Sequence, residues 1–346
     1  MMSPGPSVRL SCPDRQGPKQ RQSPNRLVTR YTQRSMRRLM AHASDYQLFG
    51  LRIRSEIELP ELFPFDGEGE ANVTIRWGSV AAGPVERPFD YEGEAIALSI
   101  GGVARFRIED GSTILVDPAP GVPERNIRLF LLGSAFGALL HQRGLLPLHA
   151  NAIEIDGKSV AFMGESGAGK STLAAWFHDH GHRIIADDVC VVRFRTGGQA
   201  VTPPGLPRLR LWHDALKAMG REESNFQRSY AGDNDSNKFD VPVAREAAAT
   251  AEADLSAIYL LEKADALEIS RIDGLAAAEA VFANTYRGIY INAVKGEHRH
   301  WSSCVTLVRN TPIYRLRRRW GLDHMEEQCR RLVEHAKEAA ENPIGG

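Results

Sequence analysis

Gly164-Glu165-Ser166-Gly167-Ala168-Gly169-Lys170-Ser171-Thr172 matches the pattern G-x-x-x-x-G-K-[ST] of a phosphate-binding loop, and this stretch decides the fold. Its glycines allow successive backbone N–H groups to turn inward around phosphate oxygens. Lys170 would place a point charge beside the β- and γ-phosphates, and the Ser171 hydroxyl would hold Mg²⁺. We therefore predict that residues 164–172 bind a nucleoside triphosphate.

The segments on either side of the loop have the periodicity that the motif requires. Ser159 to Met163 is typical of a short buried strand that enters the loop, and Ser171 to Phe177 of a helix that leaves it. This strand-loop-helix order predicts an α/β domain, which we place at residues 144–342.

The composition of the chain limits the classes of protein to which it can belong. The chain has 346 residues, is 42 % hydrophobic and carries 43 acidic and 43 basic residues. Its net charge therefore gives no argument for a nucleic-acid or membrane partner. The longest apolar run, Leu129 to Leu140, is too short to span a bilayer and predicts a buried helix within residues 124–143. We see no apolar core of a signal peptide near the N-terminus, which favours a cytoplasmic protein.

Two further regions precede the loop. Residues 1–44 are rich in Pro, Ser, Gln and Arg, so we predict a disordered basic arm, either a dispensable extension or an arm for nucleic acid or an acidic partner. Residues 45–143 predict a smaller β-rich α+β domain. Its expected strands are Tyr46 to Ile53, Asn72 to Trp77, Ala95 to Ile100, Val103 to Ile108 and Thr113 to Val116.

Two adjacent carboxylates, Asp187 and Asp188, follow an apolar segment that ends at Ala186. We expect residues 182–186 to form a strand beside and parallel to the strand at 159–163, which would bring both aspartates to the loop. One carboxylate could then reach Mg²⁺ while the other faces an incoming hydroxyl. His149 opens another expected strand, and a lone histidine at such a place is more often structural than catalytic.

The stretch from His149 to Val192 resembles the catalytic domain of HPr kinase/phosphorylase in the order and spacing of its parts. These are a histidine that opens a strand, a hairpin turn at Asp156-Gly157, the loop, a helix, and the run Gly181-His182-Arg183-Ile184-Ile185-Ala186-Asp187-Asp188. The resemblance implies a mixed sheet with flanking helices, and ATP and Mg²⁺ as cofactors. It also implies that Asp187 accepts the proton of a substrate serine, that Asp188 lies near the metal, and that His149 lies beside the phosphates.

The resemblance weakens downstream of the aspartates. In the family, a motif close to L-E-[IV]-R-G-[LI]-G supplies a further acidic residue, whereas this chain has Pro207-Arg208-Leu209-Arg210-Leu211-Trp212. The chain is therefore more similar to divergent HPr-kinase-like proteins, some of which phosphorylate serine in lasso-peptide precursors. Arg208, Arg210 and Lys238 are then candidates for phosphate or acidic-substrate contacts, or equally for solvated surface charges. A homo-oligomer is compatible with the resemblance, because that family forms hexamers.

We accordingly predict a serine kinase that acts on a protein or peptide partner, and two other functions stay open. A nucleotide-binding scaffold could recruit a peptide without catalysis. Asn237-Lys238-Phe239-Asp240 spells the guanine-reading pattern N-K-x-D of GTPases, but it follows a polar segment where a GTPase has a buried strand.

Overall fold

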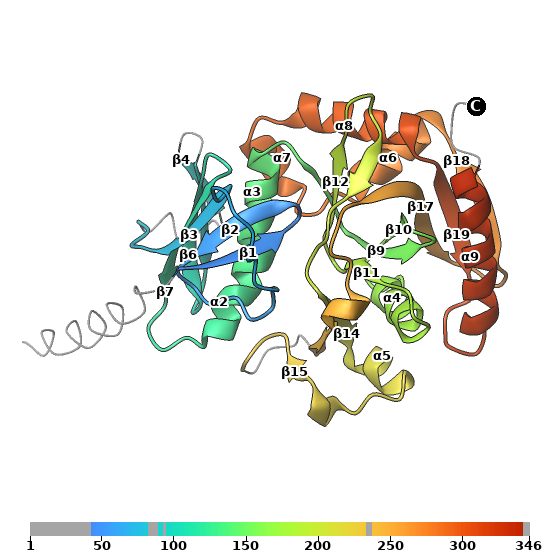
Figure 1. Cartoon of the computed structure of the whole chain (residues 1–346), viewed down its shortest axis with the longest axis horizontal. Helices are drawn as coiled ribbons and strands as arrows, with labels where there is room; N and C mark the ends of the chain where they lie inside the picture. The colour runs from blue at the N-terminus through green and yellow to red at the C-terminus, as the bar shows by residue number, and fades with distance from the viewer. Residues whose placement is uncertain (1–42, 82–88, 93–94, 233–236, 342–346) are drawn as a thin grey trace, which may run out of the picture. The chain divides into compact units, whose positions relative to one another are not determined.

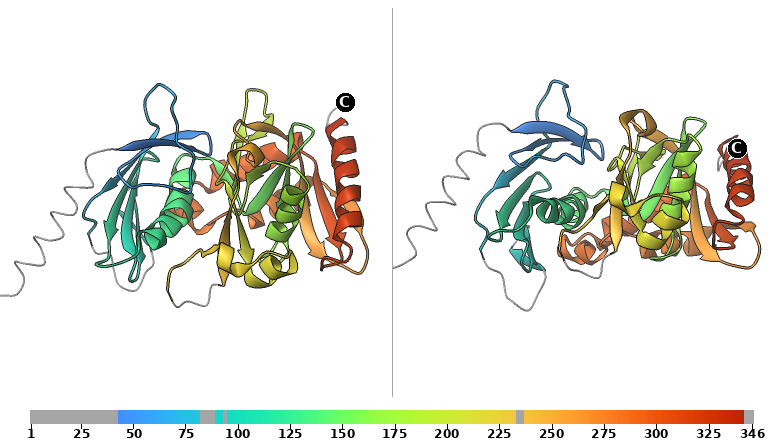
Figure 2. Two further views of the ribbon diagram at one scale, coloured as in Figure 1. Left: turned by 60° about the horizontal axis from the view of Figure 1, so that its bottom comes forward. Right: turned by 90° about the horizontal axis from the view of Figure 1, so that it is seen from below.

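The computed structural model describes residues 43–81, 89–92, 95–232 and 237–341 (Figures 1 and 2). The predicted disordered arm, residues 1–44, lies almost wholly outside these ranges. The predicted boundary at residue 144 between a β-rich domain and an α/β domain stays a prediction.

The first sheet contains seven strands in the order β1-β2-β3-β7-β6-β5-β4. They are β1 (Ser44–Leu48), β2 (Leu51–Ser55), β3 (Val73–Trp77), β4 (Phe89–Glu92), β5 (Ala95–Ile100), β6 (Ala104–Glu109) and β7 (Thr113–Pro118). The predicted single strand at 46–53 is wrong, because Phe49 and Gly50 have φ of 55° and 72° and turn the chain into a β1–β2 hairpin. The other predicted strands of this region are confirmed within two residues at each end.

A helical segment packs on this sheet. It runs through α2 (Glu124–Phe130), a π-helical turn at Leu131–Ala135 and α3 (Phe136–Gln142), and it confirms the helix predicted within residues 124–143. Its buried side chains belong to the same core as those of the sheet. The helical segment contributes Leu131, Ala135, Phe136 and Leu139, and the sheet contributes Ile53, Ile75 and Phe106.

The second sheet has nine strands and confirms a mixed sheet with flanking helices. Its strands are β8 (Leu146–Leu148), β9 (Ala150–Ile155), β10 (Lys158–Met163), β11 (Ile184–Ala186), β12 (Cys190–Phe194), β13 (Ala200–Thr202), β17 (Ala253–Lys263), β18 (Glu268–Ile272) and β19 (Ile313–Arg318). The long strand β17 pairs in parallel with β10 and with β19, and antiparallel with β13. The carboxyl ends of β10, β17 and β19 therefore meet at one edge of the sheet.

Helices cover both faces of this sheet. Successive residues of a strand point to opposite faces, so the side chains of β10 pack against helices on both. Val160 and Phe162 share a core with α4 (Lys170–Asp179) and α9 (Met325–Glu341). Ala161 and Met163 share another core with α6 (Gly274–Ala283) and α8 (Glu297–Asn310) (Figure 1). The continuous apolar run of β10 is thus explained by burial on both sides.

The prediction that residues 182–186 lie directly beside the strand at 159–163 is wrong. The segment that precedes the aspartates forms β11, which pairs antiparallel with β9, and β9 lies between β11 and β10. The tight turn at Asp156-Gly157 returns the chain as a hairpin and fills that side of β10, while β17 fills the other. Since β11 and β10 are both antiparallel to β9, they still run in the same direction, and β11 ends at the edge where the loop begins.

A small third sheet joins β14 (Arg208–Trp212), β16 (Lys238–Pro242) and β15 (Gln227–Arg228) in that order. The remaining helical segments are α5 (His213–Ala218), α7 (Ile289–Ala293) and two 3₁₀ turns at Glu223–Asn225 and Arg245–Ala247. Within the part of the chain that the structure describes, no helix is both long and apolar enough to cross a membrane.

A buried histidine joins α8 to the segment that follows α6. His300 is 6 % exposed, its Nε2 lies 2.8 Å from the Thr285 hydroxyl, and its ring lies 5.8 Å from that of His141. Burial, reinforced by the neighbouring His141 and Arg299, lowers the pKa of His300 to about 4. The folded protein therefore resists protonation at a pH where the unfolded chain accepts a proton freely.

We expect this histidine to make the protein acid-sensitive. Its contribution to stability is complete above the ordinary histidine pKa and is lost as the pH falls from about 6.5 towards 4. Chemical denaturation at pH 7.5 and pH 5.0 should show that His300→Gln, which retains a hydrogen-bonding group, loses about 2 kcal/mol less than the wild type between these pH values. His298→Gln, an exposed position on the same helix, is the control and should leave the pH dependence unchanged. An equal pH dependence in His300→Gln and the wild type would contradict this account.

Candidate active site

The predicted phosphate-binding loop connects β10 to α4, which begins at Lys170, so the strand-loop-helix prediction is confirmed. Gly164 and Gly169 adopt φ of 147° and 80°, which other residues rarely do. A Cβ on Gly164 would lie 3.0 Å from the carbonyl oxygen of Leu261 on β17. Glycine is therefore required both for the turn and for the close approach of the loop to the sheet.

Lys170 is 7 % exposed and folds back onto the loop. Its Nζ donates hydrogen bonds to the carbonyl oxygens of Gly164 and Glu165, at 2.7 and 3.0 Å. Burial lowers its pKa, against the opposing charges of Asp188 and Asp187. The ammonium group is thus held within the loop by neutral acceptors, which a phosphate oxygen could replace.

Asp187 joins the end of β11 to the start of α4. The Ser171 hydroxyl donates a hydrogen bond to Asp187 Oδ1 at 3.1 Å, and the backbone N–H of Arg210 donates to the other carboxylate oxygen. The residue is 2 % exposed. Burial, and next the charge of Asp188, raises its pKa to about 6.

Asp188 turns away from its neighbour, because its φ of 72° is left-handed. Its Oδ1 lies 3.5 Å from His149 Nδ1, and its Oδ2 accepts a hydrogen bond from Arg210 Nη1 at 3.3 Å. Burial acts to raise the pKa of Asp188, but the surrounding positive charges, that of Arg210 first, outweigh it and hold the pKa below its usual value. Asp188 is therefore ionised at neutral pH.

His149 lies between β8 and β9, against the aspartates. Its Nδ1 is 3.1 Å from the carbonyl oxygen of Asp188, and its backbone N–H donates to the carbonyl oxygen of Asn284 at 2.7 Å. Burial, and then the charge of Lys170, lowers its pKa, so the imidazole is neutral at pH 7.

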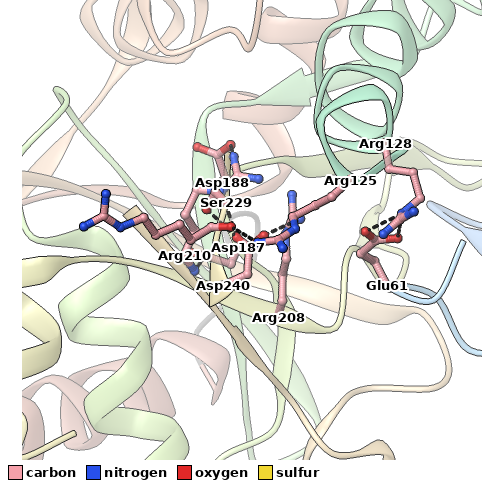
Figure 3. A network of polar contacts seen from close by, with 10 residues as sticks. Glu61, Arg125, Arg128, Asp187, Asp188, Arg208, Arg210, Ser229 and Asp240 are labelled. Carbon is pink, nitrogen blue, oxygen red and sulfur yellow. Dashed lines mark hydrogen bonds and ion pairs between the residues drawn. The ribbon is translucent and has the colours of Figure 1, made fainter. Parts of the chain in front are cut away.

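Two arginines of β14 face one aspartate of β16 (Figure 3). Arg210 Nε donates to Asp240 Oδ1 at 3.2 Å, Arg208 Nη1 donates to Oδ2 at 3.2 Å, and the Ser229 hydroxyl donates to Oδ1 at 2.8 Å. Arg210 thereby links Asp240 to Asp188. Among the described residues, Arg210 Nη2 has no hydrogen-bond partner although it is buried.

Two cavities with shared lining residues lie at this site. A cavity of about 110 Å³ follows the loop and the start of α4, and a larger one of about 1190 Å³ extends from the loop towards the ends of β17 and β19. Six residues line both cavities, namely His149, Ser166, Asp188, Arg210, Trp212 and Lys238. Lys238 Nζ lies 4.6 Å from the ring centroid of Trp212, which is 44 % exposed. Asp187 and Arg208 line neither cavity.

The structure therefore brings together the residues that the sequence nominates for the site. Two of them line neither cavity: Asp187, which binds Ser171, and Arg208, which is buried against Asp240. Sequence reasoning missed Asn284, whose side-chain oxygen accepts a hydrogen bond from the Gly164 N–H at 2.9 Å. It also missed Tyr286 and Arg287, which line the larger cavity. These residues follow α6, more than a hundred positions from the loop, and no local motif marks them.

The donor set beside the loop fits Mg²⁺. Ser171 Oγ and the carboxylates of Asp187 and Asp188 are hard oxygen donors, which this ion prefers. Among the residues that the structure describes, no cluster of three or more His, Cys, Asp or Glu side chains could hold a metal. An ion here would therefore rely on oxygens of a bound nucleotide as well, which is usual for Mg²⁺.

No protein-family model and no curated protein matches this chain. Among solved structures, the Hpr(Ser) kinase/phosphatase from Coxiella burnetii matches 57 % of this chain and 99 % of its own length. The identity is 15 % and the TM-score is 0.31.

Removal of Asp240 should destabilise the protein strongly. Asp240→Ala would leave Arg208 and Arg210 facing each other with side chains only 9 % and 13 % exposed. Losing one partner of a buried ion pair costs about 3–5 kcal/mol. We expect a loss of about 3 kcal/mol in the free energy of unfolding by urea denaturation, partly restored by adding Arg208→Met.

Asp254 offers the matched control. It also contacts two cations, Lys158 and Arg195, but their side chains are 44 % and 43 % exposed. Asp254→Ala should therefore cost no more than about 1 kcal/mol. Equal losses for the two variants would show that burial of the arginines does not matter.

Proposed function

We propose that this chain is a Mg²⁺- and ATP-dependent serine kinase of the HPr-kinase-like type, which transfers the γ-phosphate to a serine hydroxyl of a protein or peptide, such as a lasso-peptide precursor. The observation that supports this function is that the predicted phosphate-binding loop and an ionised aspartate border the same two neighbouring cavities. Asp188 and His149 line both the small cavity at the loop and the larger cavity beyond it.

The loop and Lys170 are the proposed binding groups for the β- and γ-phosphates. Backbone N–H groups at the start of α4 and the ammonium group favour negative charge at this point. Lys170 already points at the loop, where its contacts are carbonyl oxygens. Phosphate oxygens would form stronger, charge-assisted hydrogen bonds with it. Catalysis would then rest on positioning and on neutralisation of the developing charge.

The resemblance implies that Asp187 accepts the hydroxyl proton and that Asp188 lies at the metal. The hydrogen bonds support the opposite division. Asp187 is closed off from both cavities and bonded to Ser171, which is the arrangement of the serine and aspartate that hold Mg²⁺ in phosphate-loop enzymes. Asp188 lines both cavities, so its position suits the acceptor of a proton from a serine hydroxyl. Bound Mg²⁺ would neutralise phosphate charge during transfer.

Arg210 and Lys238 are the proposed contacts for the transferred phosphate or for an acidic substrate. Both line the two cavities, whereas Arg208 lines neither and binds Asp240, which also binds Arg210. The unpartnered Nη2 of Arg210 leaves a donor available for an anionic oxygen. A peptide segment would enter through the larger cavity, which extends past Phe130 and Arg287.

The geometry gives less support to the two other functions. In a GTPase, Asp240 would have to read guanine, but here its carboxylate accepts hydrogen bonds from Arg208, Arg210 and Ser229. A scaffold that only binds nucleotide would not need an ionised carboxylate at the junction of the two cavities. Asp188 therefore favours the kinase over the scaffold.

Asp188→Asn provides the test. Purified protein with Mg-ATP and serine-containing peptides should give phosphoserine by mass spectrometry, and slow phosphate release from ATP without peptide provides a readout that needs no known substrate. We expect Asp188→Asn to lower both rates by about 10²- to 10⁴-fold and to change the Kd for ADP by less than about threefold. Asp187→Asn should instead raise the Mg²⁺ concentration needed for half-maximal rate.

Asp254→Asn, at an exposed ion pair of the same sheet, is the control and should behave as the wild type. If Asp187→Asn removed transfer at saturating Mg²⁺ and Asp188→Asn did not, the division of roles implied by the resemblance would be correct. A wild type that binds ATP yet neither phosphorylates peptides nor releases phosphate would support the scaffold.

A further inference from the structure

A buried arginine lies beside the loop. Arg318 is the last residue of β19, whose carboxyl end shares the sheet edge from which the loop leaves β10. It is 3 % exposed. The neighbouring Arg315 and Arg317 differ, because both are partly exposed and pair with Glu262.

The surroundings of Arg318 offer it little compensation. Within the described ranges it pairs with no carboxylate, and its Nε has no hydrogen-bond partner. Its Nη1 has the Met325 sulfur 4.0 Å away as a weak acceptor. The nearby Cys329 cannot supply negative charge, because burial raises the pKa of its thiol to about 12. A buried cation in this state is costly unless an anion joins it.

The guanidinium group contacts the loop at the residue that precedes Lys170. A Cβ on Gly169 would lie 2.8 Å from Arg318 Nη2, so the side chain lies directly against the backbone that cradles phosphates. Any residue other than glycine at position 169 would push the arginine away as well as strain the turn. Arg318 lines neither cavity, and Gly169 is the point at which its guanidinium group reaches the loop.

We infer that Arg318 is a second cationic binding group for the phosphates of a nucleotide held by residues 164–172. This inference rests on the proposed nucleotide-binding function and extends it to a residue that no motif marks. A guanidinium group presents several N–H donors in a fixed plane and stays charged when buried, which suits phosphate oxygens. The ligand would then supply the countercharge that the described residues do not.

Two consequences have opposite signs. Without nucleotide, the unpaired charge destabilises the fold, so Arg318→Met should melt at the same temperature as the wild type or higher. With nucleotide, the same substitution removes a binding group, so affinity should fall. An arginine that merely supports the loop would instead lower the melting temperature of the free protein when replaced.

The experiment measures Kd by calorimetry for Mg-ATP, ADP and adenosine, together with melting temperatures of the free proteins. We expect Arg318→Met to weaken ATP and ADP binding at least tenfold and to leave adenosine unchanged, since adenosine carries no phosphate. Arg318→Lys keeps the charge and should lose less affinity. The control is Arg317→Met, which removes an exposed arginine of the same strand and should bind as the wild type does.

The outcomes separate this inference from the function on which it rests. If the wild type binds ATP and Arg318→Met binds it equally well, the inference is wrong and the nucleotide-binding function stands. If Arg318→Met and Arg318→Lys both melt below the wild type and weaken adenosine as much as ATP, the residue is structural and the inference also fails. If the wild type binds no nucleotide, both proposals fall together.

Discussion

The site depends on a balance of buried charge beside the loop. Burying an ionised group costs several kcal/mol unless opposite charges and hydrogen bonds compensate it. Arg210 lies between Asp188 and Asp240, and Arg208 completes the neutralisation of Asp240. Asp187 is buried beside the charge of Asp188, and these two causes raise its pKa to about 6, although its hydrogen bonds from Ser171 and from the Arg210 N–H act in the opposite direction. The network therefore keeps Asp188 ionised, whereas a bound cation would stabilise the ionised form of Asp187.

The strand β17 is what assembles these groups from distant parts of the chain. It pairs with β10, β13 and β19, and it is parallel to β10 and β19. The loop after β10 and Arg318 at the end of β19 therefore reach one edge of the sheet, although about 150 residues separate them along the sequence. The close approach of Gly164 to the Leu261 carbonyl on β17 fixes the loop against that edge.

The parts of the site that the sequence predicts are those with local causes. A phosphate-binding loop needs its glycines, lysine and serine in consecutive positions, so residues 164–172 and the flanking strand and helix could be recognised directly. Strand order has no such local signal. The hairpin turn at Asp156-Gly157 could be recognised from the sequence, but the position of β9 between β10 and β11 was missed. Asn284 and Arg318 were also missed, because each reaches the loop only through long-range packing.

The distribution of charge within the two cavities distinguishes the ligands that each can hold. In the small cavity, the lining cations are Lys170, Arg210 and Lys238, and Asp188 is the only carboxylate that the described residues contribute. That excess suits a compact polyanion such as a triphosphate. The large cavity adds cations and carboxylates in similar number, namely Lys263, Arg287, Glu165 and Glu262. A mixed lining of this kind suits a polar chain segment better than a second phosphate. The chain as a whole carries no net charge, but cations outnumber carboxylates in the lining of the small cavity. The local charge of this cavity, and not the net charge of the chain, therefore indicates its ligand.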